Sequence, residues 1–240
     1  MWFKVLAAIS NNVAEVSRRI AEAARRVGRD PAEVSLMAVT KTHPAERIRE
    51  VYAAGVRLFG ENRVQEFAGK EESLRDLHDA EWHMIGHLQS NKAGKAPELF
   101  AAVDSVDSLR LAQRLNASAH ALRKKLSVLI EINVGGEAAK SGVAPGSGEL
   151  EAILCGAGTL EHLHFRGLMT VPPFTEDPQQ ARPYFRELRK LRDQIAARNL
   201  PGIGVNVLSM GMSHDFEVAI EEGSTCVRVG TAIFGERTKI

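Results

Sequence analysis

Lys41 stands directly after VSLMAVT, a mostly apolar run that is typical of a buried strand. A lysine in this place is either an ordinary solvated loop residue or a reactive amine. Desolvation and nearby cations such as Arg228 would disfavour its ammonium form. A neutral amine can attack a carbonyl carbon and form a Schiff base. The sequence allows this chemistry at Lys41 and leaves the solvated lysine open.

Two loops near the C-terminus carry residues suited to an anion. Gly211 and Ser213 precede a predicted helix in LSMGMSHDFEVAI, and Gly230 and Thr231 come directly after Val229 in VRVGTAIFG. Backbone N–H groups at a helix start bind anions, and glycine lets a ligand approach the backbone closely. The alternative is a helix N-cap followed by tight turns. Taken with Lys41, the two loops favour a phosphate site.

Arg228 alternates with Val227 and Val229 in the last predicted strand. If both valines pack outward against helices, the arginine faces the inside of the sheet. A buried guanidinium needs an anion or another acceptor. A phosphate, a ring nitrogen and an acidic side chain in a structural ion pair all remain open as its partner.

Eight predicted strands alternate with helices along the chain. They cover residues 34–40, 56–62, 81–87, 101–108, 126–134, 163–171, 204–211 and 225–235. An extra helix precedes them, from about Val5 to Val27, and ends at Gly28. One of the later helices is predicted over residues 64–77. The alternation predicts a parallel α/β sheet, and eight units predict a single-domain (β/α)8 barrel over residues 1–240. A doubly wound open sheet is the competitor, but the first strand lacks the GxGxxG turn.

The C-terminal strand ends of such a barrel carry its active residues. Polar and flexible residues lie near the C-terminal ends of the predicted strands, among them Lys41, Asn62, Ser209, Met210, Ser213, Arg228, Gly230 and Thr231. A lysine able to form an imine, facing a phosphate cradle across the barrel mouth, suggests pyridoxal 5′-phosphate.

Seven segments in order carry a family resemblance: AVTKTHP, LFGENRVQE, WHMIGHLQSNK, EINVGGEAAKSGV, FRGLMTVPP, LSMGMSHDFEVAI and VRVGTAIFGER. They span residues 38–237, and the chain resembles the pyridoxal phosphate homeostasis protein family. The resemblance implies a barrel like the N-terminal one of alanine racemase, with the cofactor held as a Schiff base on Lys41. It also implies phosphate contacts near Ser213, Gly230 and Thr231, with Asn62 beside the ring. Met210 and Arg228 complete the expected cofactor-binding set. His87 departs from the family pattern, where proline is expected.

Three functions compete on this reading. The first is a non-catalytic carrier that holds or delivers pyridoxal phosphate, with apo-enzymes that use the cofactor as partners. The second is an amino-acid racemase. Alanine racemases take a tyrosine base from a second domain, which we do not expect here, and Tyr52 and Tyr184 fall on predicted outer helices. An Arg228 facing the pyridine nitrogen would also make the ring a poor electron sink. An aldolase-type Schiff base on Lys41 ranks third.

Composition limits the remaining classes. The 31 basic and 30 acidic side chains give a net charge of +1, which offers no case for nucleic acid or an anionic membrane. Cys155 and Cys226 form no CxxC pair and are expected to be reduced. His83 and His87 would lie about 13 Å apart on one strand, which disfavours a shared metal. We expect a cytoplasmic monomer without a signal peptide or membrane span.

Overall fold

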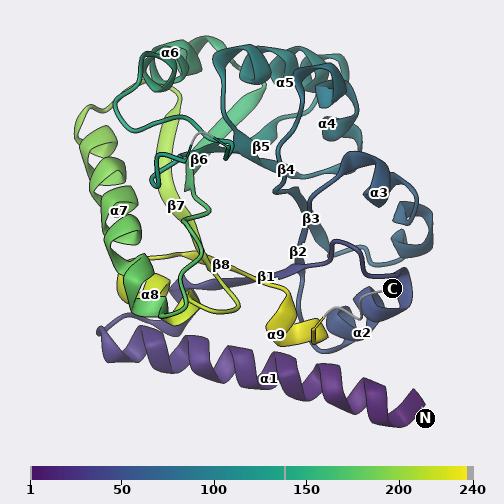
Figure 1. Ribbon diagram of the computed structural model, residues 1–240. Coiled ribbons are helices and arrows are strands. Elements are labelled where there is room, and N and C mark those ends of the chain that lie inside the picture. The colour runs from purple at the N-terminus through teal and green to yellow at the C-terminus, as the bar shows by residue number, and fades with distance from the viewer. Residues whose placement is uncertain (1, 138, 237–240) are drawn as a thin grey trace.

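The computed structural model describes residues 2–137 and 139–236. Its strands pair in chain order, all in parallel, and β8 pairs with β1 to close a barrel (Figure 1). The strands are β1 (Ser35–Val39), β2 (Leu58–Glu61), β3 (Glu81–Met84), β4 (Ala102–Val106), β5 (Leu126–Glu131), β6 (Leu163–Met169), β7 (Ile203–Met212) and β8 (Cys226–Val229). The predicted (β/α)8 barrel is therefore confirmed.

Helices surround the strands on the outside of the barrel (Figure 1). They are α2 (Ala45–Ala53), α3 (Val64–Ala68), α4 (Ala96–Leu99), α5 (Leu109–Ala121), α6 (Gly148–Gly156), α7 (Arg182–Ala197), α8 (Phe216–Glu221) and α9 (Thr231–Phe234). Short 3₁₀ helices cover Pro31–Glu33, Glu71–Leu74, Ser90–Lys95, Ala157–Thr159 and Pro178–Ala181. Every residue of β4 and β8 is buried, as expected where helices cover a parallel sheet. Across the described ranges, no helix is long and apolar enough to cross a membrane.

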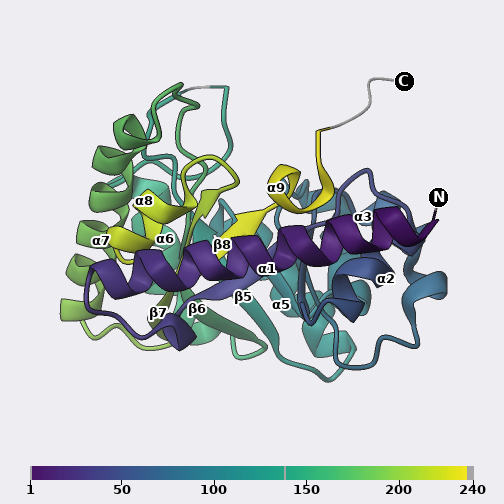
Figure 2. The same ribbon diagram turned by 90° about the horizontal axis from the view of Figure 1, so that it is seen from below.

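The extra N-terminal helix α1 (Trp2–Arg26) packs against α2, α8 and α9. It runs along the barrel wall beside β8 and β1 (Figures 1 and 2). Ile9, Val13, Val16 and Ile20 form its buried stripe, at the three- and four-residue spacing of one helix face. The helix ends at Arg26, close to the predicted end, and Gly28 just beyond it has a φ of 71°, in the left-handed region that favours glycine.

The helix predicted over residues 64–77 is broken in the structure. The first part, α3, ends at Ala68, and a separate 3₁₀ helix covers Glu71–Leu74. Between them Lys70 leaves the helical conformation, with φ −121° and ψ −9°. Its amine lies 2.7 Å from the buried carboxylate of Glu61. The break thus accompanies an inward ion pair that the helical pattern alone does not indicate.

The last predicted strand, residues 225–235, was too long. β8 ends at Val229, and Thr231–Phe234 forms the short helix α9. The N–H groups of Gly230 and Ala232 donate to the Ser213 hydroxyl instead of to a neighbouring strand. Short apolar runs such as TAIF suit a strand or a buried helix equally well.

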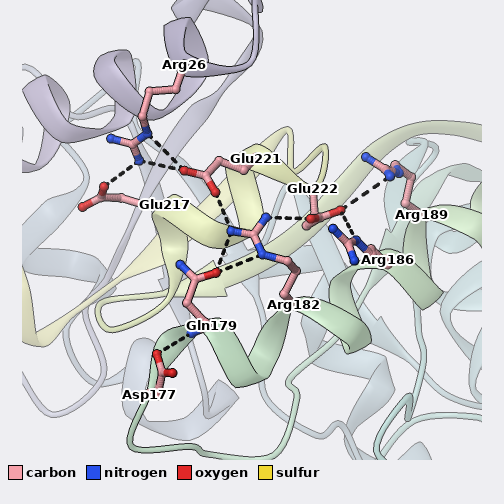
Figure 3. Close-up of polar contacts among 9 residues, drawn as sticks. All are labelled: Arg26, Asp177, Gln179, Arg182, Arg186, Arg189, Glu217, Glu221 and Glu222. Carbon is pink, nitrogen blue, oxygen red and sulfur yellow. Dashed lines mark hydrogen bonds and ion pairs between the residues drawn. The ribbon is translucent and has the colours of Figure 1, made fainter.

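An ion-pair network ties α1, α7 and α8 together (Figure 3). The Glu222 carboxylate, 5% exposed, lies within 3.5 Å of the guanidinium groups of Arg182, Arg186 and Arg189 on α7. Arg182 also pairs with Glu221, which pairs in turn with Arg26 on α1. Burial would raise the pKa of Glu222, but Arg182 and Arg186 outweigh it and lower that pKa. The network fixes α8, the helix that follows the Ser213 loop.

Candidate functional site

A cavity of about 360 Å³ opens at the C-terminal end of the strands. The residues that line it are Val39, Lys41, His43, Asn62, Ile85, Val171, Phe174, Met212, Ser213, His214, Arg228, Gly230, Thr231 and Gly235. Six of the seven residues expected from sequence are brought together here: Lys41, Asn62, Ser213, Arg228, Gly230 and Thr231. The seventh, Met210, is fully buried in the core and is not among the lining residues. Met212 lines the cavity from the same strand.

Lys41 sits in a tight turn that follows β1. Thr40, just before it, is fully buried and hydrogen-bonds to the Gly60 carbonyl through its N–H, at 3.0 Å. Thr42, just after it, has φ +65°, which is unusual for a β-branched residue. The Thr42 N–H donates to the Glu66 carboxylate. Both neighbours are thus anchored, and the half-buried lysine lines the cavity between them.

Lys70 stabilises this turn through hydrogen bonds to its backbone. Its amine donates to the carbonyl oxygens of Thr40 at 3.1 Å and His43 at 3.3 Å. The same amine pairs with Glu61 at 2.7 Å, and the Thr40 hydroxyl donates to that carboxylate. Burial raises the pKa of Glu61, although Lys70 and Thr40 act against the rise. Lys70 therefore supports the Lys41 turn while it neutralises a fully buried acid.

The loop after β7 and the start of α9 form a cluster of donors. The Ser213 hydroxyl accepts hydrogen bonds from the N–H groups of Gly230 and Ala232, each at 3.2 Å. Asp215 closes the loop by accepting from the Met212 N–H at 2.6 Å. Gly211 has φ +93°, and a Cβ there would come within 2.9 Å of Phe216 Cα, so the loop requires glycine. The two N–H groups thus converge on the Ser213 oxygen, which lies beside the cavity.

Gly230 differs from Gly211. Its φ of −115° suits many residues, and a Cβ there would meet Val39 at an ordinary 3.5 Å. Neither backbone conformation nor protein packing accounts for glycine at this position. Close approach of a ligand to the Gly230 backbone, which lines the cavity, would account for it. This observation fits the phosphate cradle expected from sequence.

Arg228 is 3% exposed and lines the cavity. Its guanidinium donates to the Ser209 hydroxyl and to the Thr170 carbonyl, both at 2.7 Å. Among the described residues it forms no ion pair with a carboxylate within 4.0 Å. The structural ion pair left open by the sequence is thus not observed in that part of the chain. A buried cation held by neutral oxygens favours an anionic or electron-rich ligand.

A second cavity, of about 530 Å³, lies at the opposite end of the barrel and has a different charge. Its lining includes Glu33, Glu81 and Asp104, whereas no acidic residue stands among the described residues that line the Lys41 cavity. Active sites of these barrels lie at the C-terminal end of the strands. Position and charge therefore both favour the smaller of these two cavities as a site for an anion.

His83 bridges two carboxylates in that opposite cavity. Its Nδ1 lies 3.1 Å from Asp104 and its Nε2 lies 3.0 Å from Glu81. His87 lies beyond the end of β3 and contacts Asp107 instead, at 3.0 Å. Among the described residues, no group of three or more histidine, cysteine or acidic side chains is arranged so that it could hold a metal ion. The His83 arrangement is an ion-paired imidazolium.

We expect His83 to make the stability of the fold depend on pH. Burial disfavours the imidazolium, but Asp104 and Glu81 outweigh it and raise the pKa of His83 from 6.5 to about 9. The stabilisation is therefore complete below about pH 6.5 and is lost as the pH rises through about 9. The free energy of unfolding should fall by up to about 3 kcal/mol over this range. Urea titrations at several pH values measure it.

His83→Gln should flatten the pH dependence between pH 6.5 and 9, because no imidazolium remains to lose its proton. His164→Gln, which changes an exposed histidine on β6, is the matched control and should keep the wild-type slope. A wild-type curve as flat as that of the His83 variant would contradict the assignment.

The chain matches one family model over nearly its whole length. The model for the N-terminal domain of alanine racemase covers residues 6–238. Alanine racemase from Corynebacterium glutamicum, at 20% identity and a TM-score of 0.70, shares the fold over 97% of this chain and 62% of its own. The fold and the strand-end cavity thus define a barrel of the alanine racemase N-terminal class.

Closer relatives narrow this class. The pyridoxal phosphate homeostasis protein of Pseudomonas aeruginosa is 46% identical, over 97% of both chains. That of Aquifex aeolicus is 47% identical over 88% of this chain and 90% of its own. The solved structure of PipY from Synechococcus elongatus, with PLP bound, is 38% identical with a TM-score of 0.81, over 95% of this chain and all of that one. The chain belongs to the pyridoxal phosphate homeostasis protein family.

The sequence did not predict several of the residues that line this cavity. His43 stacks on Phe234 with ring centroids 4.0 Å apart, and Ile85, Val171, Phe174 and His214 complete the wall. His43 could have been found from its place beside Lys41. Phe174 directly follows the FRGLMTVPP segment, but an exposed phenylalanine in a loop carries no pattern of its own.

Proposed function

We propose that this protein binds pyridoxal 5′-phosphate in the C-terminal cavity as a Schiff base on Lys41. One observation carries the proposal: Lys41, Arg228 and the Ser213–Gly230 donor cluster meet around one cavity, with no acid among its described lining residues. The family membership supports it, since PipY has been solved with PLP bound. An anionic phosphate and an aldehyde are the two groups that this lining suits.

Each residue has a part in the proposal. The neutral Lys41 amine adds to the aldehyde carbon, water leaves, and a C=N bond remains. Ser213, Gly230 and Thr231 hold the phosphate, and Asn62 lies beside the ring. Arg228 would face the pyridine nitrogen, and its neutral hydrogen-bond partners leave both this role and a phosphate contact open. Met210 is fully buried and lies outside the lining, so it has no direct contact with the ligand in this proposal.

We further propose that the protein holds and supplies the cofactor to apo-enzymes without turning over amino acids. Racemisation needs a second base on the other face of the substrate carbon. Neither tyrosine is among the lining residues, and the Tyr52 hydroxyl donates to Asp79 on the outside of the barrel. An Arg228 at the pyridine nitrogen would keep that nitrogen unprotonated and weaken the ring as an electron sink.

Reduction with borohydride tests this function directly. The purified protein is incubated with pyridoxal phosphate, reduced, digested and mapped by mass spectrometry. We expect one pyridoxyl-phosphate adduct, on the peptide that contains Lys41. Adducts spread over surface lysines, or none at all, would defeat the proposal. The loaded protein should also form no D-alanine from L-alanine at enzyme-like rates, and sustained racemisation would favour the enzyme instead.

A further inference from the structure

The loop between β6 and the 3₁₀ helix Pro178–Ala181 places two apolar side chains in solvent. Phe174 is 80% exposed and Val171 is 38% exposed. Both line the Lys41 cavity. An exposed phenylalanine forgoes the free energy that burial of its ring would provide. Its place at the rim of the cavity suggests that a ligand provides that burial.

The loop that carries Phe174 is anchored on both sides. Lys140 donates from its amine to the Pro172 carbonyl at 3.1 Å. On the other side, the His214 Nε2 lies 2.9 Å from the Glu176 carbonyl oxygen, and the His214 ring centroid lies 5.7 Å from that of Phe174. These contacts fix the loop and place the Phe174 ring at the rim of the cavity, next to His214.

The cavity offers different chemistry to different parts of pyridoxal phosphate. Its donors suit the phosphate, and Lys41 suits the aldehyde. The aromatic ring of the ligand still needs apolar contacts on its faces, and aromatic pairs favour offset or edge-to-face packing. Phe174, Val171 and Ile85 are apolar side chains of this lining. Of these, Phe174 has the largest exposed fraction and therefore the most surface to bury.

We propose that Phe174 packs on the bound pyridoxal phosphate and sets how fast the protein releases it. The inference rests on the proposed function and extends it to the rate of supply. The Phe174 ring must move away from the bound ligand, or lose its contact with it, before the ligand can leave. Phe174 thus controls how long the ligand stays bound. This role differs from that of the lysine that bonds to the ligand and from that of the donors that hold its phosphate.

The release rate tests the role of Phe174. Loaded protein is mixed with excess alkaline phosphatase, which hydrolyses only the freed ligand, and the decay of the visible absorption band is followed. We expect Phe174→Ala to release the ligand about tenfold faster, the equivalent of some 60 Å² of lost apolar contact. Phe174→Leu should restore part of the retention, because it keeps apolar bulk at the rim.

Leu122→Ala is the matched control, since Leu122 is also an exposed apolar residue, 43% exposed, next to the end of α5. It should release the ligand at the wild-type rate. Equal rates for Phe174→Ala and wild type would overturn the inference and leave the Schiff base on Lys41 intact. A melting temperature of the ligand-free protein lowered more by Phe174→Ala than by Leu122→Ala would mean that Phe174 stabilises the loop, and would overturn it too. Wild-type protein that never acquires the band would instead defeat the proposed function.

Discussion

Replacing Lys41 with alanine should abolish the visible absorption band that the wild-type protein acquires with pyridoxal phosphate. The band requires a C=N bond, and the anchored turn of Thr40 and Thr42 presents Lys41 to the cavity. Affinity should fall by more than about 100-fold, which corresponds to roughly 3 kcal/mol of lost bonding. The Ser213 and Gly230 donors remain, so weak non-covalent binding should persist. Absorption spectra and equilibrium dialysis measure the two effects.

Lys41→Arg separates the bond from the charge. Arginine keeps a cation in the cavity but stays protonated and does not form the Schiff base. We therefore expect this variant to lack the band as well, while it binds the phosphate better than Lys41→Ala. Lys92→Ala, which removes an exposed lysine from the 3₁₀ helix Ser90–Lys95 after β3, should leave the spectrum unchanged. A full band in either Lys41 variant would place the reactive amine elsewhere.

The barrel could be predicted because its signal is repeated. Each strand is a short apolar run, each is followed by a helix, and eight such units leave few arrangements for a parallel sheet. Individual boundaries are less certain, since they depend on single tertiary contacts. The break at Lys70 accompanies its pairing with Glu61, and the end of β8 coincides with the hydrogen bonds to the Ser213 hydroxyl. Local sequence contains neither partner.

The site was predictable to a similar degree and for a similar reason. Six expected residues meet at one cavity because the C-terminal strand ends of a barrel converge. Met210 lies outside its lining because it alternates with Ser209, whose hydroxyl accepts from the cavity-lining Arg228. The pairing of β7 with β8 is irregular between Ser209 and Met212, and Met212 does line the cavity. Phe174 lies in a loop, and Lys70 lies at the break of a predicted helix. In such segments the hydrophobic periodicity of the sequence does not indicate which way a side chain points.

The second large effect should come from Lys70, which lies outside the cavity. Lys70→Met leaves the Glu61 carboxylate, 0% exposed, without its cation at 2.7 Å. An uncompensated buried charge of this kind costs about 3–5 kcal/mol. The variant also loses the hydrogen bonds to the Thr40 and His43 carbonyls, which brace the Lys41 turn. Denaturant titration should show the lost stability, and the band with pyridoxal phosphate should weaken.

The pH dependence of the stability of Lys70→Met shows whether the buried Glu61 carboxylate causes the loss. Burial already raises the pKa of Glu61 above its ordinary value of 4.5, and removal of Lys70 should raise it further. The penalty is absent below the unfolded pKa, where both states are protonated, and is complete above the folded pKa. Lys70→Met should therefore lose least stability in acid and most at neutral pH.

A double variant isolates the Glu61–Lys70 pair. Glu61→Gln combined with Lys70→Met removes both charges, so it should recover much of the stability that Lys70→Met loses at neutral pH. Lys124→Met is the matched control, because this partly buried amine donates to the Phe100 carbonyl at 3.4 Å. It should cost much less. If the double variant were no more stable than Lys70→Met, the damage would come from the unbraced Lys41 turn and not from the orphaned acid. The absorption band with pyridoxal phosphate would then identify the cause. Loss of the Lys70 contacts to the Lys41 turn weakens this band in Lys70→Met and in the double variant alike.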